Sequence, residues 1–475
     1  MKCPTLKSFI WMGVCIAICL ITVACHKSGR HKRLTPEATR QMRLGWNLKT
    51  LVEAYKTAGR TDPKWDEPAE SALNEWARIR SHSTDSDEDW RSIISHNCAA
   101  AIDAGCADPM IRYLSLRNTI NRIGTKQEVA NEYCKVAQDM EGSPYPSIRK
   151  FYAWERAGQQ LKSAYGSRSN FPPELQQLDN WGKAESDLLN ALSDRTMPPE
   201  EAYDACHELL EAWKWSNDHY SSLYQNIEGK LTDDWKSDPL FLLLKGEVYI
   251  QLGWQARGGG YANTVTSEGW KLFGKRLAVA EEALNTAWQL STNDPRIAVK
   301  MIWVELGQGK GRDRMELWFQ RAMKADPNDY DACDAKLLYL EPKWYGSVAD
   351  MLEFGCECVS NKQWGGHVPL ILMDAHVAIQ QQFAADAEKA DYWKQPQVWT
   401  DLNSAFERFF ELNPGEIGWY HNYAWYAYQA GQWATLNKLI PKLGPVNYDY
   451  FGGRDKFEEM VAQAKKHAGE TKAKD

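Results

Sequence analysis

Several chemical signatures are missing from this chain of 475 residues. It contains no C-x-x-C pair and no H-E-x-x-H motif, the spacings that bring thiolates or imidazoles onto one zinc ion. It also lacks the G-x-S-x-G segment that exposes the serine nucleophile of many hydrolases. Basic residues do not predominate, because 56 Lys and Arg face 63 Asp and Glu, for a net charge of −7. We therefore expect no metal, no cofactor and no nucleic-acid partner.

Sustained alternation of polar and apolar residues, the pattern of a half-buried β-strand, is also missing. Apolar residues recur at helical spacing instead, and short polar breaks between the segments favour antiparallel neighbours. Several segments begin with a cap and a proline, the clearest being Thr35-Pro36-Glu37. Helices are predicted, among others, over residues 65–79, 110–120, 127–140, 147–165, 173–192 and 199–215.

Residues 299–327 match the second half of a tetratricopeptide repeat. An apolar first helix leads into a glycine-rich turn, and Phe319 and Ala322 lie on a second helix before Pro327. The small Ala lets neighbouring helices approach closely, and the Phe fills the space beside it. Pro295 and Pro327 are 32 residues apart, which is close to the period of such repeats. We predict an all-α fold, a tetratricopeptide-like superhelix of helical hairpins, or α-solenoid.

The chain is rich in aromatic residues, with 22 tryptophans and 21 tyrosines. Bulky aromatic side chains bury much surface and keep a polar group for the rim, so most of them are interpreted as filling interfaces between helices. An aromatic-lined groove for a peptide or a glycan is the alternative. Hydrophobic residues make up 44% of the chain, which supports a globular core and argues against extensive disorder.

The first 25 residues are typical of a signal peptide with a possible lipobox. Lys2 and Lys7 precede an apolar run of 16 residues over 9–24, which is short for a membrane-spanning helix. A small residue followed by Cys25 resembles a bacterial lipobox, in which the cysteine is lipidated, although Thr22 replaces the usual leucine. Cleavage to a soluble secreted protein and an uncleaved anchor are the alternatives. We expect a lipoprotein of the cell envelope that faces the extracytoplasmic side.

Seven of the eleven cysteines follow this leader, and an odd number cannot all pair within one chain. Four of them lie within helical patterns and are predicted to be buried thiols: Cys98, Cys134, Cys206 and Cys333. Cys356 and Cys358 are two positions apart on a predicted helix, so they point in different directions and do not form a metal pair.

The chain is predicted to consist of five segments. These are the signal peptide with its possible lipobox (1–25), a tether (26–35), an N-terminal helical region (36–230), a tetratricopeptide-like repeat region (231–464) and a charged, frayed tail (465–475).

Five short motifs occur in order along the chain: GCADP at 105–109, WQARGGGYA at 254–262, ELGQG at 305–309, WFQRA at 318–322 and PKWYGS at 342–347. Together they resemble a bacterial family known as a domain of unknown function, number 4034, over roughly residues 90–385. The resemblance implies a helical, tetratricopeptide-like fold. It implies no reaction.

The glycine-rich loop over 257–261 is the first candidate binding site. Three consecutive glycines lose much conformational entropy on ordering, and they let backbone N–H groups approach a ligand closely. The planar fork of Arg257 suits a carboxylate or a phosphate, and Trp254 and Tyr261 flank it. The alternative is a long hairpin loop whose arginine pairs with an acid elsewhere in the fold.

A second loop, over 342–347, leads into a helix for which Ser347 is the predicted N-cap. Either Trp344 packs against the helix entry, or Lys343 and Trp344 share a groove with Arg257. The full set of predicted ligand-binding residues is Trp254, Arg257, Gly258, Gly260, Tyr261, Lys343 and Trp344. The lysine-containing turn at 307–311 is not a phosphate loop, because Gly311 follows the lysine and no strand precedes it. His376 is interpreted as a hydrogen-bonded, half-buried histidine rather than a catalytic base.

These patterns favour a membrane-tethered interaction module, without catalytic activity, that binds a peptide, a protein or an envelope component. The membrane contact would be the lipid anchor at Cys25 or an uncleaved N-terminal segment. Two alternatives belong to other classes: an enzyme acting on envelope polymer, and a structural assembly subunit. A raised carboxyl pKa in a cleft beside Arg257 or His376 would favour the enzyme.

Overall fold

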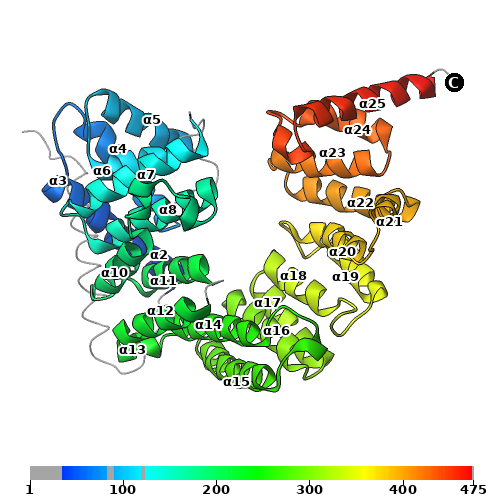
Figure 1. Ribbon diagram of the computed structural model, residues 1–475, viewed down its shortest axis with the longest axis horizontal. Helices are drawn as coiled ribbons and strands as arrows, with labels where there is room; N and C mark the ends of the chain where they lie inside the picture. Colours follow the sequence, from blue (N-terminus) through cyan, green and yellow to red (C-terminus); the bar gives the residue numbers. More distant parts are fainter. Residues whose placement is uncertain (1–34, 83–89, 119–123, 215–216, 473–475) are drawn as a thin grey trace, which may run out of the picture. The chain divides into compact units, whose positions relative to one another are not determined.

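The computed structural model describes residues 35–82, 90–118, 124–214 and 217–472 (Figure 1). Throughout these residues the secondary structure is helical and contains no strand, which confirms the predicted all-α class. The leader, Cys25 and all but the last residue of the expected tether lie outside the described residues. No helix in the described part of the chain is both long enough and apolar enough for a membrane span.

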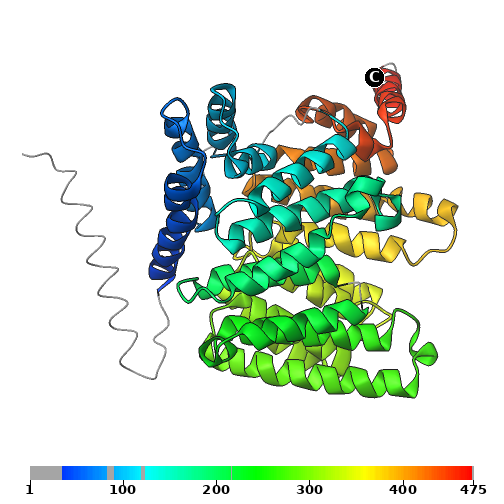
Figure 2. The same cartoon turned by 60° about the vertical axis from the view of Figure 1, so that its left-hand side comes forward.

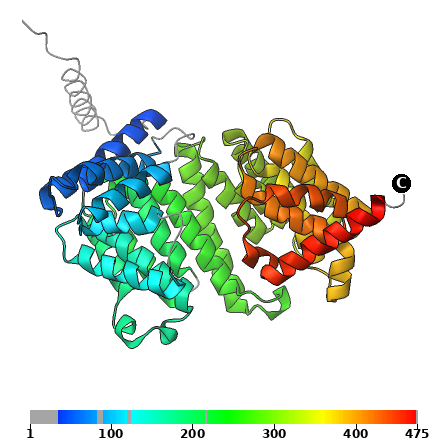
Figure 3. The ribbon, with the colours of Figure 1, turned by 90° about the horizontal axis from the view of Figure 1, so that it is seen from above.

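The described residues divide into two compact units, one ending at Leu231 and the other beginning at Thr232. The N-terminal unit is coloured blue to green in Figures 1 and 3. Its helices are α2 (Pro36–Leu48), η1 (Lys49–Glu53), α3 (Ala54–Ala58), α4 (Asp66–Arg80), α5 (Trp90–Asp103), α6 (Pro109–Asn118), α7 (Lys126–Glu141), α8 (Ser147–Tyr165), η2 (Arg168–Asn170), α9 (Pro173–Gln176), α10 (Asn180–Ala191), α11 (Pro199–Trp213) and α12 (Asn217–Lys230).

The C-terminal unit continues from α13 (Asp233–Lys236) to the end of α25. Its further elements are α14 (Pro239–Arg257), η3 (Ala262–Thr264), α15 (Ser267–Leu290), α16 (Pro295–Gln308), α17 (Arg312–Ala325), α18 (Tyr330–Tyr339), α19 (Val348–Ser360), η4 (Val368–Leu370), α20 (Ile371–Gln380), α21 (Asp386–Trp393), α22 (Pro396–Leu412), η5 (Ile417–Trp419), α23 (Tyr420–Gln429), α24 (Trp433–Leu439), η6 (Ile440–Lys442), η7 (Tyr448–Phe451) and α25 (Arg454–Lys472). The last helix therefore continues into the tail that was expected to be frayed.

Local signals set the helix starts. The hydroxyl of Thr35 accepts a hydrogen bond from the Ala38 N–H, and that of Ser347 accepts one from the Asp350 N–H, both at 3.2 Å, as predicted. One expectation is wrong in detail. The helix predicted over 173–192 is broken between α9 and α10, because Asp179 caps a new helix. After Pro327 the next helix, α18, is capped by Asp329.

Small residues allow close helix packing in the C-terminal unit. The neighbouring helices α14 and α15 lie side by side (Figures 1 and 2). A Cβ atom on Gly246 of α14 would lie only 2.5 Å from Leu284 Cγ of α15, so this approach requires glycine. Phe319 and Ala322 of α17 are both buried, as the repeat pattern predicts.

The core of the N-terminal unit contains charge as well as apolar side chains. The buried Glu201 carboxylate accepts hydrogen bonds at 2.9 Å from Arg43 Nε and Asn47 Nδ2. Arg149 Nη2 donates to Asn47 Oδ1 at 2.7 Å and to Thr50 Oγ1 at 2.5 Å. Thr50 belongs to η1, a single π-helical turn, and such turns often occur at functional sites.

The cysteines behave largely as expected. All seven described cysteines are free thiols, and Cys98, Cys134, Cys206 and Cys333 are buried. Cys358 is buried and Cys356 is exposed, so the two point in different directions as predicted. Helical spacing would put Ile93 on one face of α5 with Ile94 and Cys98, but Ile93 is exposed while the other two are buried.

Candidate functional site

The structure brings three of the predicted site residues together in the C-terminal unit. The Arg257 guanidinium carbon lies 5.6 Å from the ring centre of Trp254 and 5.6 Å from that of Trp344. It also lies 5.5 Å from the ring centre of Trp270, which the sequence did not single out. Trp254 and Trp344 meet edge to face at 5.5 Å. We call Trp254, Arg257, Trp270 and Trp344 the tryptophan–arginine cluster.

Within this cluster Arg257 orders the glycine-rich loop. Its Nη1 donates to the carbonyl oxygens of Gly258 at 3.1 Å and Gly260 at 3.0 Å. Gly258 has a φ of 78°, which favours glycine. Since no described carboxylate pairs with Arg257, its partners are indole rings and carbonyl groups rather than the acid that the structural alternative expected.

The remaining predicted residues are placed elsewhere. Tyr261 is 86% exposed, and Lys343 Nζ pairs with Glu341 Oε2 at 2.8 Å on the surface. The indole Nε1 atoms of Trp254 and Trp344 are buried and have no hydrogen-bond partner among the described residues. The cluster is therefore a packed scaffold for the loop, with Tyr261 exposed on that loop.

Arg257→Met should lower the free energy of unfolding of the C-terminal unit by about 1–2 kcal/mol, because it removes the cation–π contacts and the two loop hydrogen bonds while keeping an aliphatic stem. Urea unfolding followed by tryptophan fluorescence measures the change. Lys343→Met is the matched control, and we expect no resolvable change. An equal loss in the two variants would contradict the assignment of Arg257 to the cluster.

His376 is fully enclosed rather than half-buried. Its Nδ1 lies 2.7 Å from the Tyr392 hydroxyl and its Nε2 lies 3.2 Å from Asp401 Oδ2. Burial lowers its pKa despite the neighbouring Asp401 carboxylate. The histidine is hydrogen-bonded, as interpreted from the sequence.

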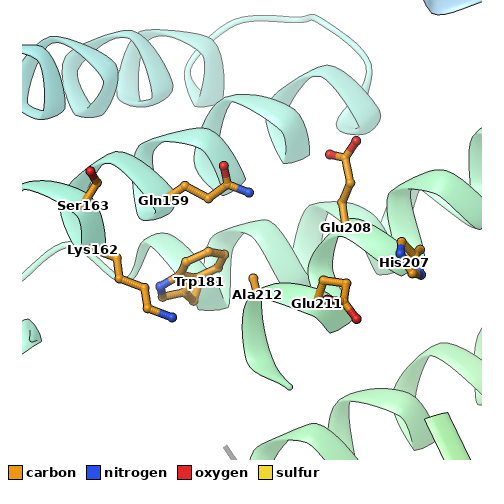
Figure 4. Close-up of a pocket in the computed structure, with 8 residues that line it drawn as sticks. All are labelled: Gln159, Lys162, Ser163, Trp181, His207, Glu208, Glu211 and Ala212. Atoms are coloured by element: carbon orange, nitrogen blue, oxygen red, sulfur yellow. The ribbon is translucent and has the colours of Figure 1, made fainter. Parts of the chain in front are cut away.

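The N-terminal unit holds an open cleft that sequence reasoning missed. Its volume is about 540 Å³. Figure 4 shows side chains from α8 and α11 along it, with Trp181 of α10 between them. We call it the N-terminal cleft, and its lining residues are Gln159, Lys162, Ser163, Trp181, His207, Glu208, Glu211 and Ala212.

Trp181 reaches the cleft because α8 carries a glycine beneath it. A Cβ atom on Gly158 would lie 2.7 Å from the Trp181 ring, so any side chain there would displace the indole. On its other side the Trp181 ring meets Trp213 edge to face at 5.8 Å. The indole is therefore held between two helices and remains partly exposed to the cleft.

Charges of both signs surround this indole. Lys162 is exposed on α8, and Glu211 is exposed on α11, where it pairs with Lys214 at 2.6 Å. Deeper in the cleft, Glu208 Oε1 lies 3.8 Å from Arg80 Nη1. Burial raises the pKa of Glu208 despite that arginine. The cleft thus offers an apolar surface with a cation on one wall and carboxyl groups on the other.

No protein-family model matches this chain, and a search of curated proteins finds no match. The resemblance to the family numbered 4034 therefore stays a prediction. Fold and site together define an all-α protein with a ligand-sized cleft in its N-terminal unit.

Proposed function

We propose that this protein is a helical-repeat binding protein without catalytic activity, and that its N-terminal cleft holds a short peptide segment of a partner. The observation that carries the proposal is the partly exposed Trp181 at the centre of an open cleft of about 540 Å³. That volume falls within the range of about 300–1,000 Å³ typical of ligand pockets. Tryptophan supplies apolar contact area at such sites and is enriched among binding hot spots.

The charges define the peptide that fits. An apolar side chain of the peptide would cover the Trp181 indole. Lys162 would meet an acidic residue or a C-terminal carboxylate, and Glu211 would meet a basic residue. The present partner of Glu211 is a surface lysine one helical turn away, and such exposed pairs are weak and easily exchanged.

We further propose that the hairpins form a tetratricopeptide-like superhelix and that the protein is tethered at Cys25 on the extracytoplasmic side. Support for the repeat comes from the packing of α16 against α17 and from the buried Phe319 and Ala322. Support for the tether comes from the sequence of the leader, with its short apolar run before Cys25.

The test is to select binders from a phage-displayed random peptide library with the detergent-solubilised, full-length protein. We expect enriched peptides that bind at least about tenfold more weakly to Trp181→Ala, because hot-spot tryptophans contribute about 2 kcal/mol or more. Trp90→Ala is the matched control, since Trp90 lies on α5, which packs against α4 and α6. Peptides that bind both variants equally, or no enrichment at all, would contradict the proposal.

One observation favours a second candidate, an enzyme acting on envelope polymer. Glu208 lines the open cleft, and burial raises its pKa, which favours the protonated form that a general acid requires. This raised carboxyl lies in the N-terminal unit and not beside Arg257 or His376. The test is to incubate the protein with purified cell-wall polymer and to measure the reducing ends that are released. The enzyme hypothesis predicts that the wild type releases them and that Glu208→Gln does not. No release by the wild type would exclude this activity on that polymer.

A further inference from the structure

A second, smaller cavity lies next to the N-terminal cleft, with Glu208 lining both. Its volume is about 20 Å³. Four arginines line it: Arg80 of α4, Arg117 of α6, and Arg149 and Arg156 of α8. Four guanidinium groups around so small a space are unusual in a protein interior, because buried charges are normally paired.

Three of these arginines carry a donor that makes no hydrogen bond. The Nε atoms of Arg80, Arg149 and Arg156 are buried and have no hydrogen-bond partner among the described residues. Buried N–H groups are nearly always hydrogen-bonded, and leaving one unpaired costs free energy. Because all three residues line the same cavity, their unpaired donors indicate that an acceptor belongs there.

Arg149 is the least compensated of the three. It is only 3% exposed, and it donates hydrogen bonds to the uncharged side chains of Asn47 and Thr50. No described carboxylate lies within ion-pair distance of it. Burial lowers its pKa to about 10, although the negative charge of Glu201 partly opposes this shift.

The carboxylates of this region pair with only some of its arginines. Glu201 is shared by Arg43 and Arg80, Asp204 pairs with Arg43, and Glu208 pairs with Arg80. Among the described residues, Arg117, Arg149 and Arg156 therefore have no ion-pair partner. Glu155 lines the cavity without an ion pair to any described residue, and burial raises its pKa to about 7. The charged and titratable groups around the cavity are Arg80, Tyr113, Arg117, Arg149, Tyr152, Glu155, Arg156 and Glu208.

We propose that this cavity binds one halide-sized anion, chloride under physiological conditions, at the Nε–H groups of Arg80, Arg149 and Arg156. Size selects the ligand: a cavity needs about 10–15 Å³ to hold one water molecule, so this one accepts about one sphere of that size. A carboxylate or phosphate group has several heavy atoms and does not fit. The anion would satisfy the three donors and offset the excess positive charge.

The test combines two measurements on the full-length protein. Melting temperature is compared in sodium chloride and sodium gluconate at equal ionic strength, and crystals soaked in sodium bromide are searched for anomalous scattering in the cavity. We expect a higher melting temperature in chloride and a bromide peak next to the three Nε atoms. A cavity that holds water alone, with equal melting temperatures in the two salts, would overturn the proposal.

Variants make the test specific. Arg156→Met removes one donor from a half-buried position. The apparent affinity for chloride, taken from how the melting temperature depends on chloride concentration, should fall at least about tenfold. Arg112→Met is the matched control, because Arg112 of α6 pairs with Asp139 outside the cavity. Glu155→Gln removes a competing negative charge, and it should tighten halide binding at pH 8 more than at pH 6. Equal chloride dependence in the wild type and Arg156→Met would also refute the site.

Discussion

Arg43→Met should lower the free energy of unfolding of the N-terminal unit by about 3–5 kcal/mol, the usual loss when one partner of a buried ion pair is removed. Arg43 Nε donates to the fully buried Glu201 at 2.9 Å, and its Nη2 donates to Asp204 at 2.8 Å. Against the effect of burial, Arg80 and Arg43 hold the pKa of Glu201 below its usual value. Methionine keeps the apolar stem but leaves that carboxylate short of donors.

Urea unfolding followed by far-ultraviolet circular dichroism measures this loss. Arg40→Met is the matched control on the same helix, because Arg40 pairs with Glu37 on the exposed face, and it should cause no resolvable change. The losses caused by Arg43→Met and Glu201→Met should not add in the double variant, because the two side chains are hydrogen-bonded to each other and the cycle isolates their coupling. A loss in Arg43→Met no larger than in Arg40→Met would contradict the role of the pair.

The loss should also depend on pH. A carboxyl group whose pKa is lowered in the folded protein stabilises it above the unfolded pKa, and that contribution disappears as pH falls through the folded pKa. The difference between wild type and Arg43→Met should therefore be full at pH 7 and shrink toward strongly acidic pH. A difference that stays constant down to acidic pH would show that lost packing, rather than charge, explains it.

Helix bounds and helix caps could be predicted from the sequence, because they depend on residues that are close together along the chain. The helix over 147–165 was predicted with the bounds that α8 has, because Pro146 ends the preceding turn and apolar residues recur along the helix. The caps at Thr35 and Ser347 were likewise predicted from a few residues each. One of two alternatives placed both Lys343 and Trp344 in a groove with Arg257. The structure places Trp344 against Arg257, but Lys343 pairs with Glu341 on the surface.

The N-terminal cleft could not be predicted from such local patterns. Its lining comes from residues 159–163, 181 and 207–212, and only the packing of α8, α10 and α11 brings them together. Of these, His207 and Glu208 form an H-E pair, but the second histidine of a zinc motif is missing from the sequence. The glycine at 158 could have drawn attention, because glycine inside a long helix indicates close approach by a neighbour, here Trp181.

The burial of charged side chains on α8 could not be predicted from the sequence either. Arg149 and Glu155 look like solvent-facing residues in a helical pattern, yet both are buried. Nothing local distinguishes them from Lys162 on the same helix, which is exposed. Their burial follows from the elements that cover α8 in three dimensions, and no spacing along one helix encodes that arrangement.

Glu155→Gln should raise the free energy of unfolding of the N-terminal unit at pH 8 by about 3–4 kcal/mol. Glu155 is 1% exposed, and burial together with the nearby Glu208 raises its pKa to about 7. In the unfolded chain a glutamate titrates near about 4.3, and each unit of difference is worth about 1.4 kcal/mol. Gln cannot ionise, so it avoids this cost, and it can still accept the hydrogen bond that Gln159 donates to the carboxyl group.

The sign of the pH dependence follows from linkage. Between about pH 4 and pH 7 the unfolded chain has released the proton that folded Glu155 retains, so the wild type loses stability as pH rises through this window. Glu155→Gln should lack this slope and match the wild type near pH 4. Chloride-free buffer keeps halide binding out of the comparison, and Glu132→Gln on the exposed face of α7 is the control. A difference in stability between wild type and Glu155→Gln that stays constant from pH 4 to pH 8 would mean that Glu155 titrates normally in the folded protein. Glu155 would then be ionised at neutral pH, and the excess of positive charge around the small cavity would be smaller.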